Sequence, residues 1–164
     1  MTNASFRLTK SATALLGLLA TLPFATIHAD PMNVTATVLQ GCELGAITDT
    51  AFGPLTPGSG LDVSATGTIQ WRCTSGTTAD ITIDDGLLGT RTMGGPGTVK
   101  YELYKEVAHT NKWGDAAGEE VAVTGVGMTS FSTETVFGEV LHVDYVDSSV
   151  GVYSDTVTVL INII

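Results

Sequence analysis

Apolar and polar residues alternate along most of this chain, and a period of two is the spacing of a β-strand with one buried face. Apolar spacings of three and four do not extend far enough to predict a helix, and Gly, Thr and Val dominate the composition. We therefore predict an all-β fold. The predicted strands are residues 45–47 with the Phe52 region, 66–73, 78–84, 99–105, 120–124, 139–143 and 152–164.

Turn signals separate these strands, and the clearest clusters are Gly53-Pro54 and residues 57–60, 84–86 and 94–97. Short strands with frequent turns indicate a β-sandwich or barrel. Within residues 66–73, Ile69, Trp71 and Cys73 fall on one face, as expected for a half-buried strand. No internal repeat, linker or low-complexity segment divides the chain after residue 29, so we expect one domain there.

The two ends of the strand pattern are unusual. Residues 32–38 alternate apolar and polar just before Cys42 and predict a lone strand, while residues 155–164 form a β-branched run without a turn or cap. A terminal strand and an unfinished sheet are the two halves of a joint made by β-augmentation. The pattern therefore suggests a protein that joins to copies of itself.

Residues 1–29 have the three parts of a secretion signal. Arg7 and Lys10 precede an apolar run over residues 12–20, and Ile27-His28-Ala29 is a small-residue cleavage site. The alternative is a membrane anchor, but the run is shorter than the roughly 20 residues needed to span a bilayer. We predict export, a mature chain that starts near Asp30, and no transmembrane segment in it.

Cysteine content and charge limit the partners. Cys42 and Cys73 are the two cysteines, and in an oxidising compartment such a pair predicts a disulfide; a zinc site would need four ligands. After signal removal, five basic residues face 17 acidic ones, a formal charge of −12. None of the five cations forms a run, so we expect no nucleic-acid partner.

Catalytic motifs are not found in the mature sequence. His109 and His142 accompany neither a Gly-x-Ser-x-Gly elbow nor a His-Glu-x-x-His pair. The acidic pairs Asp84-Asp85 and Glu119-Glu120 lie beside glycines, where turn formation explains them; calcium binding there stays open, although the spacing does not match an EF-hand. We predict a non-enzymatic protein and name no cofactor.

Several short segments resemble a known family in their order along the chain. These are Cys42-Glu43-Leu44-Gly45, Phe52-Gly53, the Cys73 that ends a strand, Arg91-Thr92-Met93, residues 101–106 and 110–115, and residues 153–159. Together they resemble the spore coat protein U family, which contains the pilins of archaic (Csu-type) chaperone/usher pili. The resemblance extends over essentially the whole mature chain.

The resemblance implies an incomplete immunoglobulin-like β-sandwich that lacks its last strand and is completed by a donor strand from a neighbouring subunit. It divides the chain into a signal peptide (1–29), a donor-strand extension (30–41) and a pilin domain (42–164). By alternation, the donor anchors would be Met32, Val34, Ala36 and Val38. The acceptor groove would be bordered by the last strand, with these residues facing inward: Val157, Val159, Ile161 and Ile163.

The resemblance also implies partners and a location. The subunit would fold on a periplasmic chaperone, pass through an outer-membrane usher and polymerise with other pilin subunits into an extracellular pilus for attachment and biofilm formation. An antibody-type disulfide between sheets is not expected, because Cys42 and Cys73 are 31 positions apart and Trp71 lies on the strand of Cys73.

Two other functions stay open. An adhesin or ligand-binding module is the first alternative, in which Trp113 and the four tyrosines would form a sugar-binding surface. Tip adhesins of such pili resemble two-domain proteins without a donor strand, so one domain with a donor-like strand favours a shaft or adaptor subunit. A small secreted hydrolase is the second alternative, and it lacks a catalytic constellation.

Overall fold

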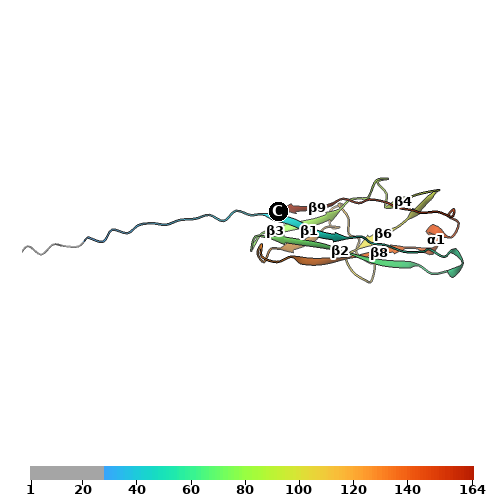
Figure 1. Ribbon diagram of the computed structural model, residues 1–164, viewed down its shortest axis with the longest axis horizontal. Helices are drawn as coiled ribbons and strands as arrows, with labels where there is room; N and C mark the ends of the chain where they lie inside the picture. Colours follow the sequence, from blue (N-terminus) through green and yellow to red (C-terminus); the bar gives the residue numbers. More distant parts are fainter. Residues whose placement is uncertain (1–27) are drawn as a thin grey trace, which may run out of the picture. The chain divides into compact units, whose positions relative to one another are not determined.

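The computed structural model describes residues 28–164, and Thr37–Ile164 form one compact unit (Figure 1). The basic residues and the apolar run of the predicted signal peptide lie outside the described residues. The fold is all-β, as predicted. Its strands are β1 (Cys42–Thr48), β2 (Val63–Cys73), β3 (Thr78–Ile83), β4 (Thr92–Gly94), β5 (Thr98–Lys100), β6 (Glu102–Tyr104), β7 (Val121–Thr124), β8 (Ser132–Val140) and β9 (Val159–Ile163), with the short helical segments η1 (Pro57–Ser59) and α1 (His142–Tyr145).

The strands form two main sheets and one hairpin. One sheet has the order β1-β2-β8-β6, the other has the order β7-β3-β9, and β4 pairs with β5 alone. All pairings are antiparallel. A four-stranded and a three-stranded antiparallel sheet that face each other make an immunoglobulin-like sandwich. In a complete sandwich of this kind, one more strand would pair with the outer edge of β9. Among residues 28–164 no strand occupies that position beside β9.

Buried side chains from both sheets meet in the larger of two apolar clusters. The main contributors are Ile69 and Trp71 from β2, Ile81 and Ile83 from β3, and Val136 from β8. Trp113 is buried among them, and its indole N–H donates a hydrogen bond to the Ile81 carbonyl oxygen at 2.9 Å. Each fully buried side chain of this size stabilises the fold by about 1.5–3 kcal/mol. The core therefore holds the two sheets face to face.

The predicted strand over residues 99–105 is divided at Tyr101. β5 pairs with β4, whereas β6 pairs with β8 in the first sheet. The chain thus changes partner at Tyr101, and the local apolar pattern gives no signal of this exchange. The three-residue strand β4 was not predicted.

The predicted strand over residues 139–143 was misplaced. β8 spans Ser132–Val140, and the residues that follow begin α1, where the His142 N–H donates to Asp62 Oδ1 at 2.7 Å. Three of the five inward positions of β8 carry no large apolar side chain, namely Ser132, Glu134 and Gly138. The strand therefore lacks the apolar alternation from which it could have been predicted. The carboxylate of Glu134 accepts a hydrogen bond from Trp71 Nε1 at 3.3 Å, so this position is filled by a polar contact instead.

The predicted C-terminal strand over residues 152–164 is shorter than expected. β9 starts at Val159, and residues 152–158 join the hairpin through a single bridge between Gly94 and Ser154. The Thr158 N–H donates to the side-chain oxygen Oδ1 of Asp84 at 2.8 Å. At this position a carboxylate oxygen therefore accepts the hydrogen bond that a backbone carbonyl of a neighbouring strand would otherwise accept. Burial acts to raise the pKa of Asp84, but the hydrogen bonds from Thr158 and Gly86 outweigh it and lower that pKa.

The strand expected at residues 32–38 is not formed in this chain. Residues 28–41 contain neither helix nor strand, and the side chains of Met32, Val34 and Val38 are each more than 80 % exposed, at 83, 81 and 82 %. A strand needs a partner for its backbone N–H and C=O groups, and an unpaired strand is not stable in water. The alternation is therefore present in the sequence without the ladder that would make it a strand.

Candidate functional site

The outer edge of β9 is free. Val159 and Ile161 pair with Ile83 and Ile81 of β3, and no residue in the described range 28–164 pairs with the opposite edge. Natural sheet edges are usually protected by charged side chains, proline or a bulge. The sequence of β9 is Val-Leu-Ile-Asn-Ile and has none of these. Its unpaired N–H and C=O groups are therefore available to another strand.

The four residues expected to face inward along this strand differ in how far they are buried. Val157, Val159 and Ile161 are half-buried and pack against the core cluster. Ile163 is 44 % exposed and lies at the end of the strand, opposite Ala79 of β3. The structure thus brings three of the four residues together on the inward face and leaves Ile163 at its margin.

A groove of about 940 Å³ lies beside the first residue of β9 and the segment that precedes this strand. It is lined on one side by residues 47–55, the end of β1 and the loop after it, and on the other by residues 148–157 and Val159. Core side chains line it as well, namely Ile69, Ile83, Leu103 and Val136. The hydrophobic core can therefore be reached from outside between these two segments.

Tyr101 and Asp155 are among the polar residues that line the groove. The Tyr101 hydroxyl donates to Asp155 Oδ2 at 2.7 Å, while Asp155 Oδ1 accepts from the backbone N–H groups of Leu87 at 2.9 Å and Thr156 at 2.8 Å. With three donors, this carboxylate is satisfied and can be covered without leaving an unmet acceptor. Burial, together with the hydrogen bond to Asp155, raises the pKa of Tyr101. Sequence reasoning missed this pair, whose members are 54 positions apart.

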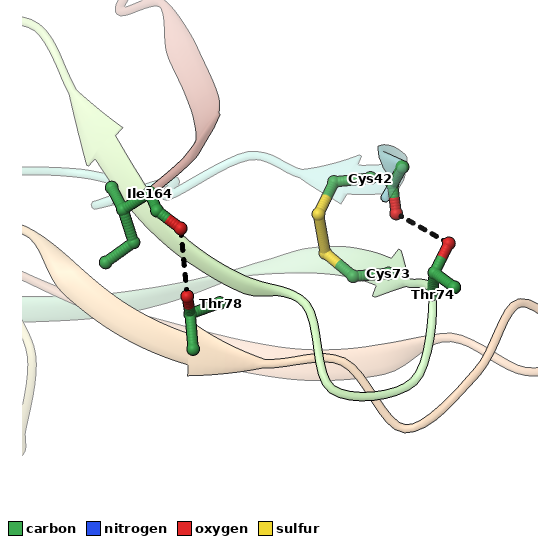
Figure 2. Close-up of a disulfide and its surroundings, with 6 residues drawn as sticks. Cys42, Cys73, Thr74, Thr78 and Ile164 are labelled. Atoms are coloured by element: carbon green, nitrogen blue, oxygen red, sulfur yellow. Dashed lines mark hydrogen bonds between the residues drawn. A yellow bond between two sulfur atoms is a disulfide. The ribbon is translucent and has the colours of Figure 1, made fainter. Parts of the chain in front are cut away.

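The disulfide joins Cys42, the first residue of β1, to Cys73, the last residue of β2 (Figure 2). The two cysteines are direct partners in the β1–β2 ladder, so the bridge lies within one sheet and not between the sheets. Just before it, the Gly41 carbonyl oxygen accepts hydrogen bonds from the Thr74 N–H at 2.8 Å and, as drawn in Figure 2, from the Thr74 hydroxyl at 3.4 Å. The expected disulfide is therefore present.

Other chemistry considered from the sequence finds little support among the described residues. Residues 28–164 hold no group of three or more His, Cys, Asp or Glu side chains suited to a metal ion. His109 Nδ1 lies 3.0 Å from Glu139 Oε1, and His142 Nε2 lies 2.7 Å from the Pro57 carbonyl oxygen. Asp84 accepts from Gly86 N–H at 3.0 Å, as in a turn. No helix in the described range is long and apolar enough to cross a membrane.

Comparison with known proteins links this architecture to one family. The family model of the Spore Coat Protein U domain matches residues 28–160 of this sequence. Among solved structures, a chain of the crystal structure of the CsuC-CsuE chaperone-tip adhesion subunit pre-assembly complex, from archaic chaperone-usher Csu pili of Acinetobacter baumannii, matches with a TM-score of 0.56 and 22 % identity. The match covers 77 % of this chain and 40 % of that one, so this chain spans about two fifths of the matched chain's length. At this identity the likeness shows a shared fold. No curated protein matches the sequence.

Proposed function

The chain belongs to the Spore Coat Protein U domain family, and from this premise we propose that it is a structural, non-catalytic subunit of an extracellular pilus. Residues 1–29 direct export, residues 30–41 are a donor strand, and residues 42–164 form the pilin domain that accepts a donor strand. The subunit passes through the periplasm on a chaperone, and an outer-membrane usher adds it to a fibre used for attachment and biofilm formation.

The free edge of β9 beside an apolar groove is the observation that carries this proposal. The groove is lined by core residues such as Ile69 and Val136, and the edge leaves backbone groups unpaired. A strand that lies here would complete the β7-β3-β9 sheet and cover the core at the same time. Main-chain hydrogen bonds would provide affinity, and alternate side chains would provide specificity, as in other cases of β-augmentation.

Residues 30–41 supply a strand with the required pattern. Met32, Val34, Ala36 and Val38 alternate with polar residues, so one face of an extended segment is apolar. Seven residues in strand conformation span about 23 Å, enough to run the length of β9 and beyond it. The exposed apolar side chains in this segment would leave water when a neighbour's groove takes them up.

A dedicated chaperone follows from the same geometry. A subunit with an open apolar groove and a free strand edge is prone to aggregate until another strand fills the groove. The matched structure contains a chaperone in a pre-assembly complex with a pilus subunit, which supports this partner for the present chain. Chaperone, usher and further pilin subunits are therefore the partners we propose.

Charge substitutions in the extension test the proposal. We expect Val34→Asp and Ala36→Asp each to abolish polymer, because an unpaired carboxylate would be buried in the neighbour's groove at a cost of several kcal/mol. Thr35→Asp is the matched control: its side chain falls on the opposite face of the strand and polymer should persist. The measurement is the ladder of subunit multimers on unheated gels, with the chaperone co-expressed so that subunit folding is not the variable.

The control also sets the condition for failure. If Thr35→Asp is as damaging as Val34→Asp, or if none of the three substitutions changes the ladder, then residues 30–41 are not a one-faced donor strand. The proposed assembly by donor-strand exchange would then be wrong.

A further inference from the structure

β1 connects two joints of the fibre proposed above, and this inference rests on that proposal. Its first residue, Cys42, directly follows the extension that would enter one neighbour. Its last residues, Ile47 and Thr48, line the groove that would hold the extension of the other neighbour. Tension on the extension of a subunit therefore enters the strand that borders the next joint.

On its own, β1 is a weak link for such a load. It is an edge strand that pairs only with β2 among the described residues, and its register shifts between Leu44 and Ile47. Without a crosslink, tension would pass from β1 to the rest of the domain through a few ladder hydrogen bonds, each contributing about 1 kcal/mol. Displacement of β1 would also move one side of the groove.

The disulfide lies where it prevents this. It connects Cys42 to Cys73 at the first ladder pair, so tension crosses covalently to β2 before it reaches residues 43–48. The hydrogen bond from Thr74 N–H to the Gly41 carbonyl oxygen reinforces the same point. β2 is suited to receive the load, because it is 11 residues long, pairs with β8 from Val63 to Trp71 as well as with β1, and contributes core residues.

The geometry points to a mechanical role for this bond: the Cys42–Cys73 disulfide diverts tension from the extension into β2, so that load on one joint does not open the groove of the next. Cys42 and Cys73 are then positioning residues for the joint. They keep residues 47–55 beside the inserted strand when the fibre is pulled.

Single fibres held at constant force test this role. The lifetime of oxidised fibres is compared with that of assembled fibres treated with dithiothreitol, with complete reduction checked by alkylation and mass measurement. Reduction after assembly removes the need for a cysteine-free subunit to fold. We expect the lifetime under load to fall by about fivefold or more, because a barrier lower by the worth of one ladder hydrogen bond raises the breakage rate by about that factor. The multimer ladder of unloaded fibres should persist as before.

Glu43→Gln provides a matched variant. Glu43 pairs with Arg72 of β2 immediately after the disulfide, and its carboxylate accepts from Arg72 Nε at 2.7 Å. Glu43→Gln removes the negative charge of this ion pair and so weakens the contact. If tension bypasses residues 43–48, the lifetime of oxidised fibres under load stays unchanged. In reduced fibres, where β1 carries the load, the same substitution should shorten the lifetime further.

Three results would overturn the inference. The first is a lifetime under load that does not change on reduction, and the second is an equal acceleration of breakage with and without load, which would indicate a general loss of stability. The third is an effect of Glu43→Gln that is the same in oxidised and reduced fibres. If oxidised wild-type subunits form no multimers at all, the proposed function fails first and this inference falls with it.

Discussion

A single carboxylate organises one end of the groove. Asp155 accepts the Tyr101 hydroxyl on one oxygen and the Leu87 N–H on the other, which ties the segment before β9 to the turn after β3. Gly86 in this turn has φ +78°, and a Cβ there would lie 2.0 Å from Asp155 Oδ2, so the close approach requires glycine. Polar contacts of this one carboxylate thus fix a loop beside the groove.

The Tyr101 hydroxyl gives a testable pH dependence. Its pKa is raised in the folded chain, so the folded state keeps the proton at a pH where the unfolded state loses it. The stability that this group confers is therefore full below the ordinary tyrosine pKa of 10.0 and declines as the pH rises above it. We expect Tyr101→Phe to lower the free energy of unfolding by about 1 kcal/mol at neutral pH, because one hydrogen bond is lost. As the pH rises above 10, the free energy of unfolding should fall less for this variant than for the wild type. Urea unfolding midpoints from neutral to alkaline pH measure both effects; parallel curves for the two proteins would contradict this assignment.

Among the strands, the sequence pattern predicted the correct ranges where apolar and polar residues alternate without interruption. β2, β3 and β7 lie within a few residues of their predicted ranges, because their inward positions are apolar in series, as at Ala79, Ile81 and Ile83. β8 was misplaced because Glu134 and Gly138 interrupt that series on its inward face. An alternation pattern identifies a strand only when tertiary contacts leave apolar residues at the inward positions.

The candidate site was predictable in part for the same reason. Alternation placed Val157, Val159 and Ile161 on one face, and the structure has them packed against the core. The opposite side of the groove, residues 47–55, and the Tyr101–Asp155 pair depend on which distant segments meet, and no local pattern encodes that. The partner exchange at Tyr101 is a further case of the same limit.

A glycine in β2 allows the chain after β1 to cross the sheet. A Cβ on Gly67 would lie 2.7 Å from the backbone oxygen of Thr48 and 2.6 Å from Thr50 Oγ1. Because backbone must shift to accommodate it, we expect Gly67→Ala to destabilise the fold by about 1–3 kcal/mol and to weaken the multimer ladder, since residues 47–55 line the groove. Gly58→Ala is the control, with nothing within 4 Å and no left-handed backbone. Denaturant unfolding would refute this account if both variants behaved alike.

At the scale of the whole molecule, the proposed donor segment and the proposed acceptor groove are different parts of one subunit. An interface of this kind is heterologous, and when its rotation does not close into a ring it generates an open filament. Each subunit in the interior of the proposed fibre would use its extension once and its groove once. Subunits that have lost one of the two functions should therefore act as chain ends of opposite kinds.

This polarity can be tested with two assembly-defective subunits. The first carries Val34→Asp and Ala36→Asp, so that it accepts a strand but does not donate one. The second carries an added copy of residues 30–40 after Ile164, joined by a short flexible linker. This tethered copy has a millimolar effective concentration and therefore fills the groove of the subunit that carries it. The second subunit can then donate its N-terminal extension but cannot accept a strand. The first subunit is supplied in complex with its chaperone, because its groove is open. We expect neither subunit to form multimers alone and the mixture to form a one-to-one dimer of subunits and nothing longer, as measured by light scattering after size-exclusion chromatography. Replacing the first subunit by Thr35→Asp should restore longer multimers. A mixture that stays monomeric, or one that grows beyond the dimer, would show that the fibre is not built by one extension entering one groove.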